Sequence, residues 1–129
     1  MKLDAEGKSV FAGQEVVSAA RIDNLARALG STSAAGTARL APFFGPTVAG
    51  ETQFVEVLGL DLSRALLGGL TYEWTRPFHR DETVNITVFI DKVFDKGSSR
   101  FGVVVAEFHD SDGDLIQRQS STFIERKAA

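Results

Sequence analysis

Apolar and polar residues alternate through two stretches of the second half of the chain, and each stretch predicts a β-strand. In residues 70–75, every second side chain is apolar or aromatic. Residues 84–93 alternate in the same way until the apolar phase slips at Val93. A slip of this kind is typical of a β-bulge, which we place near Asp91 or Lys92.

Two more strands follow. Residues 100–109, RFGVVVAEFH, are apolar at both odd and even positions, which is typical of a strand covered on both faces. Residues 111–114, SDGD, have the composition of a hairpin turn. Residues 115–126, LIQRQSSTFIER, are a more polar last strand.

The first half of the chain has a helical period instead. Ser18 is a candidate N-cap for a helix that ends at Gly30, and residues 30–46 form a loop without His, Asp or Glu. A second helix is predicted over residues 47–60, with Gly59 near its end. Asp61 is expected to cap a short further helical piece in which Leu62 and Leu66 share a face and which Gly68 and Gly69 break.

An N-terminal arm, a helix, a loop, a buried helix and then four consecutive strands make an α+β pattern with a mainly antiparallel sheet. A long buried helix followed by a meander of long strands predicts a sheet wrapped around a central helix, which is the hot-dog fold. The 129 residues, 43% of them hydrophobic and 24% charged, suit a single domain over residues 1–129.

Composition narrows the partners and the compartment. A net charge of −3 with scattered charges offers no basic surface for nucleic acid or for anionic lipid, so neither is expected as a partner. The chain has no Cys, no apolar segment typical of a signal peptide and no run long enough to span a bilayer. We therefore expect a cytoplasmic protein, and we expect no cofactor and no metal.

Several segments together resemble a known family. They are EVVSAARIDNLARALGS, LAPFF, YEWTRPFHRDETVNITVFIDKVFDKG and FHDSDGDLIQRQSSTFIER, which span most of the chain from about Glu15 to Arg126. In these segments the chain resembles the N-terminal half type of the MaoC-like dehydratases, and within that family the non-catalytic subunits of (3R)-hydroxyacyl-ACP dehydratases.

The resemblance implies an activity and also raises a difficulty. Catalytic members of the family carry an Asp and a His a few residues apart after the first helix, where the His acts as a base beside the thioester carbonyl and the Asp helps the hydroxyl to leave as water. The matching segment here, LGSTSAAGTARLAP, contains neither residue. A general acid or base must be a titratable group, so Ser31, Thr32 and Ser33 are no substitute.

The segment RPFHRDE offers a displaced alternative. His79 and Asp81 would share a face if they lay on a strand, but Pro77 and the neighbouring charges favour a solvated turn. His109, which precedes Asp110, is interpreted as a surface residue beside a hairpin rather than as a metal ligand.

Binding residues can be suggested from composition and from helix placement. Gly45 and Pro46 come before a helix and could present backbone N–H groups to a thioester carbonyl, or they could be an ordinary helix entry. The candidate walls of an acyl-chain tunnel are Phe43, Phe44, Phe54, Leu58 and Trp74. A tunnel wall and a core wall have the same composition, so the sequence leaves both possibilities open for these five residues.

Two functions remain open. The first is a non-catalytic subunit that binds acyl-CoA or acyl-ACP and forms an oligomer, as a dimer or larger, with a catalytic MaoC-like chain. The second is an independent hot-dog acyl-CoA thioesterase that assembles with copies of itself and in which Glu51 or Glu56 activates water. A small-molecule carrier or steroid-handling protein without catalysis is a third, weaker alternative.

Overall fold

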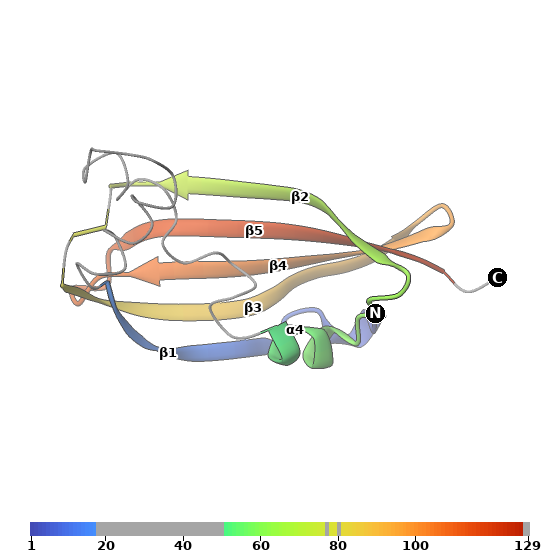
Figure 1. Ribbon diagram of the computed structural model, residues 1–129, viewed down its shortest axis with the longest axis horizontal. Helices are drawn as coiled ribbons and strands as arrows, with labels where there is room; N and C mark the ends of the chain where they lie inside the picture. The colour runs from blue at the N-terminus through green and yellow to red at the C-terminus, as the bar shows by residue number, and fades with distance from the viewer. Residues whose placement is uncertain (18–50, 77, 80, 128–129) are drawn as a thin grey trace.

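The computed structural model describes residues 1–17, 51–76, 78–79 and 81–127 (Figure 1). This part of the chain holds a short 3-10 helix, one α-helix and five strands. They are η1 (Leu3–Ala5), β1 (Ser9–Val17), α4 (Glu51–Leu58), β2 (Ala65–Trp74), β3 (Glu82–Lys96), β4 (Ser99–His109) and β5 (Leu115–Arg126). The helix predicted from Ser18 and the loop after it lie outside the described residues.

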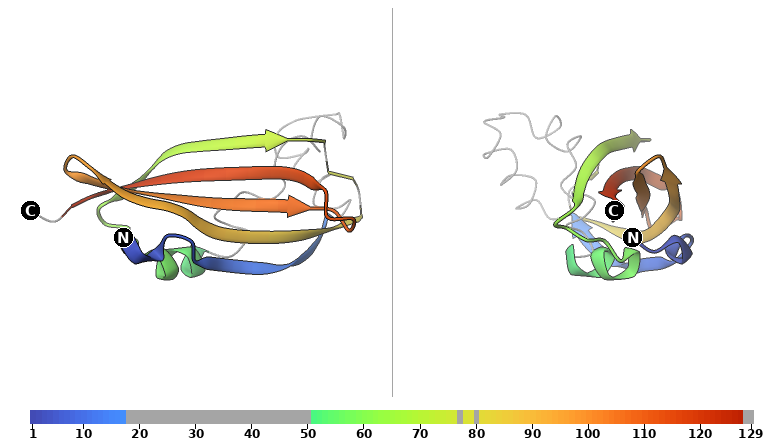
Figure 2. Two further views of the ribbon diagram at one scale, coloured as in Figure 1. Left: turned by 180° about the vertical axis from the view of Figure 1, so that it is seen from behind. Right: turned by 90° about the vertical axis from the view of Figure 1, so that its right-hand side faces the viewer.

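All five strands belong to one antiparallel sheet in the order β1-β3-β4-β5-β2. β1 and β2 are therefore the two edges. The sheet curls, and α4 and η1 lie near the end where β3 turns into β4 (Figure 2). The predicted antiparallel sheet is thus confirmed, while the only α-helix among the described residues is the eight-residue α4, so the long central helix of the prediction is not established.

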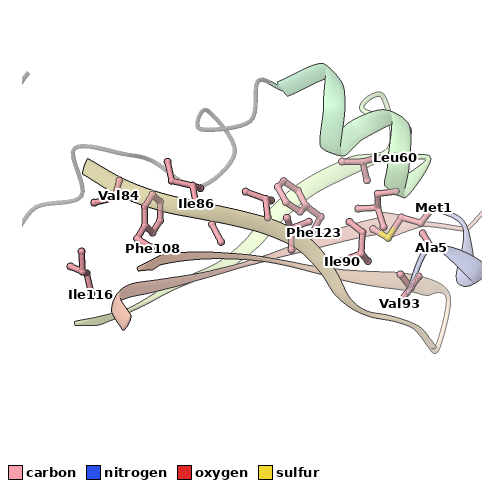
Figure 3. Packing of buried hydrophobic residues seen from close by; sticks show 14 of the residues in the cluster. Met1, Ala5, Leu60, Val84, Ile86, Ile90, Val93, Phe108, Ile116 and Phe123 are labelled. Atoms are coloured by element: carbon pink, nitrogen blue, oxygen red, sulfur yellow. The ribbon is translucent and has the colours of Figure 1, made fainter. Parts of the chain in front are cut away.

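The core lies on one side of the sheet, here called the inner face (Figure 3). Alternate residues of β3, among them Val84, Ile86, Val88 and Ile90, are buried there. Leu58 at the end of α4 packs onto this face over Gly102, where an added Cβ would lie 3.1 Å from both methyl carbons of Leu58. The helix can approach the sheet this closely because residue 102 has no side chain.

The sheet confirms three details of the alternation pattern. The register of β3 against β4 shifts between Ile90 and Lys92, at the place predicted for a bulge. In β4, the three consecutive residues 104–106 are all buried, as expected for a strand covered on both faces. The hairpin before β5 turns at Gly113, whose φ is +87°.

Two predictions about the elements are wrong. The N-terminal arm contains a fifth strand, β1, which pairs with β3. The helical piece after Asp61 does not form, because the Asp61 carboxylate accepts hydrogen bonds from the backbone N–H of Ser63 at 3.0 Å and from its hydroxyl at 2.6 Å, which stabilises a turn. β2 begins at Ala65 and runs through the two glycines predicted to break a helix, with a register shift between Leu67 and Gly69.

The end of α4 follows the prediction. Gly59 has a φ of +69°, and its N–H donates to the carbonyl of Glu56 while the N–H of Leu60 donates to the carbonyl of Val55. This pair of hydrogen bonds is the Schellman motif, which glycine favours at a helix end. In the described part of the chain, no helix is long and apolar enough to cross a membrane.

Candidate binding site

The two tunnel candidates whose side chains the structure describes, Leu58 and Trp74, both lie on the inner face of the sheet. Leu58 is completely buried, and Trp74 is half-buried near the end of β2. Gly102, which Leu58 covers, pairs with Phe123, whereas Trp74 pairs with Gln117. Six residues of β5 separate these two levels, a distance of about 20 Å at the usual rise of a strand. Leu58 and Trp74 therefore lie toward opposite ends of one face rather than around one point.

The structure describes little of the other binding candidates. Phe43, Phe44, Gly45 and Pro46 lie outside the described residues, and so does the side chain of Phe54. For these positions the roles remain predictions.

An aromatic cluster closes the inner face at the Trp74 end. The ring of Phe78 meets that of Trp74 edge to face, with ring centres 5.5 Å apart, and meets Phe108 in the same way at 5.7 Å. Phe78 comes from the connection between β2 and β3 and is 2% exposed. The segment RPFHRDE thus contributes its Phe to the core, a role that its charged composition does not indicate.

The rest of the connection behaves as a surface turn. Both terminal guanidinium nitrogens of Arg76 donate hydrogen bonds to the carboxylate of Glu82, and the backbone N–H of His79 donates to the same carboxylate at 2.8 Å. Burial alone would raise the pKa of Glu82, but the hydrogen bonds from Arg76 and His79 outweigh it and lower the pKa. The side chains of His79 and Asp81 are exposed, and Asp81 has a positive φ of 59°, as some turn residues do.

Polar residues occupy the inner face of β5, beside this aromatic cluster. Gln117, Gln119 and Ser121 are 0%, 1% and 2% exposed. Their neighbours on β4 are Phe108, Ala106 and Val104, and their neighbours on β2 are Trp74, Tyr72 and Leu70. We call Gln117, Gln119 and Ser121 the polar row.

The apolar surroundings of the polar row also change the pKa of a neighbouring side chain, that of Tyr72. Tyr72, which pairs with Gln119, is half-buried, and its burial raises the pKa of its hydroxyl above the ordinary value. Sequence reasoning recognised the last strand as polar but did not place its glutamines inside. The signal was their spacing of two, which puts Gln117, Gln119 and Ser121 on one face of a strand.

The remaining candidates for catalysis do not lie on this face. His109 pairs with Asn85, whose neighbours on β3 are the inward-facing Val84 and Ile86, so His109 is on the outer side of the sheet. Glu56 is exposed on α4, and the side chain of Glu51 is outside the described part. Within the described residues, no group of three or more His, Asp or Glu side chains could hold a metal ion.

The chain matches the model of one known protein family. Residues 5–119 match the family described as FAS1-like, dehydratase domain region. The chain belongs to this family. The resemblance to dehydratases drawn from its segments is thereby confirmed, and the structural neighbours include proteins named MaoC-like dehydratases.

Solved structures of the same fold share little sequence with the chain. A truncated HadBC (3R)-hydroxyacyl-ACP dehydratase complex from Mycobacterium tuberculosis superposes with a TM-score of 0.67 at 14% identity, covering 96% of this chain and 99% of that one. The ChsH1-ChsH2 complex from the same organism gives 0.66 at 12% identity, with 94% and 85% covered.

A longer relative in fold is the MaoC-like dehydratase from Phytophthora capsici. It gives a TM-score of 0.69 at 13% identity, covering all of this chain (100%) and 50% of that chain. The chain thus spans half of that protein. No curated protein matches the sequence.

Proposed function

We propose that the chain is a hot-dog acyl-thioester-binding protein that serves as the non-catalytic subunit of a (3R)-hydroxyacyl-CoA or -ACP dehydratase. Its membership of a dehydratase family supports the reaction class. Two neighbours in fold are described as complexes, HadBC and ChsH1-ChsH2, which supports assembly with a second, catalytic chain.

The positions of the histidines are the observation that carries the non-catalytic role. The sequence has only two, and the structure describes both. His79 is exposed in a turn, and His109 lies on the outer side of the sheet. A base that removes a proton beside a thioester must come within hydrogen-bonding distance of that proton, and neither His can do so for a ligand bound on the inner face.

The partner is expected to pair along β2. This edge strand carries Leu66 and Leu67, which are 60% and 45% exposed, and residues 65–72 contain no charged residue and no Pro. Natural edge strands usually carry charges or prolines that block pairing, so an apolar, uncharged edge of this length favours a protein partner. Each edge strand carries one charged residue, Glu73 near the end of β2 and Glu15 in β1. β2 exposes two adjacent Leu side chains, whereas the described side chains of β1 include one large exposed apolar residue, Val16 at 50%.

The test is reconstitution of activity. The chain is purified alone and together with a MaoC-like chain that carries an intact Asp and His motif, and hydration of a trans-2-enoyl-CoA is measured for each. We expect activity only for the pair. Thioester hydrolysis by the chain alone would support the thioesterase alternative instead.

A further inference from the structure

Gln117 is unusual within the polar row because an amide side chain is rarely buried deep in an apolar core without a full set of partners. Nε2 of Gln119 donates to Oε1 of Gln117 at 2.5 Å. Nε2 of Gln117 itself is buried and has no hydrogen-bond partner among the described residues. A buried donor without an acceptor destabilises the folded state, so this amide needs an explanation.

The residues around Gln117 do not account for its buried amide N–H groups. On the sheet it lies between Phe108 and Trp74, and the ring of Phe78 packs against both of these aromatic residues. The hydrogen bond to Gln119 occupies Oε1 of Gln117 and leaves the N–H groups of its own amide for something else. An N–H donor held among aromatic rings matches a single acceptor oxygen on an otherwise apolar ligand.

We infer that Gln117, held in place by Gln119, is a specificity subsite that donates a hydrogen bond to an oxygen atom in the distal part of the acyl group. The inference rests on the proposed function. If the reacting end of the thioester lies on the catalytic residues of the partner, this chain contacts the part of the acyl group beyond the hydroxyl that is eliminated. The preferred substrates are then acyl thioesters with a ketone or hydroxyl remote from the thioester, rather than plain alkyl chains.

The experiment compares matched ligands by isothermal titration calorimetry on the full chain. The ligands are octanoyl-CoA and three oxooctanoyl-CoA isomers with the ketone at carbon 5, 6 or 7. The variant is Gln117→Met, which has a similar length and no amide. The control is Gln14→Met, the same change at an exposed glutamine of β1.

We expect at least one oxo isomer to bind the unaltered chain about tenfold more tightly than octanoyl-CoA, which is what one additional satisfied hydrogen bond contributes. Gln117→Met should abolish this preference and leave the affinity for octanoyl-CoA unchanged. Gln14→Met should retain the preference.

The contrary outcomes separate the subsite from the proposed function. If all four ligands bind the unaltered chain equally, or if Gln117→Met retains the preference, the subsite is refuted while acyl-thioester binding stands. If none of the four binds, the proposed function fails and the inference fails with it. The comparison of ligands on the unaltered chain needs no variant, so equal binding of all four refutes the subsite even if Gln117→Met does not fold.

Discussion

Two adjacent residues of the β2–β3 connection should differ sharply in their effect on stability. Phe78 is 2% exposed and packs edge to face against Trp74 and Phe108, whereas the side chain of His79 is exposed. We expect Phe78→Ala to lower the free energy of unfolding by about 3 to 5 kcal/mol, the usual cost of removing a buried Phe side chain. His79→Ala should change it by no more than about 0.5 kcal/mol.

The contacts of the Phe78 ring narrow the expected loss in the free energy of unfolding for Phe78→Ala. An edge-to-face ring pair contributes about 0.5 to 1.5 kcal/mol beyond the burial of area, and Phe78 makes two such pairs. The upper half of the range is therefore expected. Phe94→Ala is the matched control. Phe94 also packs against an aromatic ring, that of Phe101 with ring centres 5.2 Å apart, but its side chain is 41% exposed.

Urea unfolding followed by tryptophan fluorescence measures all three variants. With a urea dependence of about 2 kcal/mol per molar, Phe78→Ala should lower the midpoint by roughly 2 M. A loss below about 1 kcal/mol for Phe78→Ala, or one above about 2 kcal/mol for His79→Ala, would refute the assignment of Phe78 to the core and of His79 to a surface turn.

Three further predictions concern other parts of the sheet. Gly102→Ala should cost about 1 to 3 kcal/mol in thermal unfolding, because the new Cβ would lie 2.8 Å from Sδ of Met1 and 3.1 Å from both methyl carbons of Leu58; an unchanged stability would contradict the packing of Met1 and Leu58 over this glycine. The hydrogen bond from Arg100 lowers the pKa of Asp95 from 3.8 to about 2, so its stabilising contribution is present above pH 3.8 and lost as the pH falls toward 2. Asp95→Asn should therefore flatten the fall in stability between pH 4 and 2, and identical acid curves would count against it. Leu67→Lys should shift the assembly toward monomer in sedimentation if β2 is the pairing edge, while Leu3→Lys, a change at a similarly exposed Leu (49% against 45%), should not.

The sheet was largely predictable from the sequence, and the exceptions have physical causes. β3 and β4 have strong apolar patterns, so their positions and the bulge near Asp91 could be read directly. β1 was not predicted because Ala12 and Gly13 interrupt the alternation of apolar and polar residues in this segment. The turn at Asp61 was not predicted because an Asp side chain can accept a hydrogen bond from a nearby backbone N–H either in a turn or at a helix N-cap. The residue type alone does not tell the two structures apart.

The candidate site was less predictable. In β5 the spacing shows that Gln117 and Gln119 share a face, but Ile116 and Ile124 lie at the alternate positions and suggest that the opposite face is the buried one. Pairing with β4 decides the matter, since Phe108 and Ala106 bring both glutamines inside. Long-range register of this kind cannot be obtained from a local pattern.

The central claim is that this chain binds the acyl thioester and leaves the chemistry to a partner. The most direct measurement is the turnover of a trans-2-enoyl-CoA by the complex of the two chains, with His79→Ala and His109→Ala introduced together into this chain. The account predicts the same turnover as the unaltered complex. A loss of about a hundredfold or more, with the complex still assembled, is the size expected for removal of a general base and would contradict the claim.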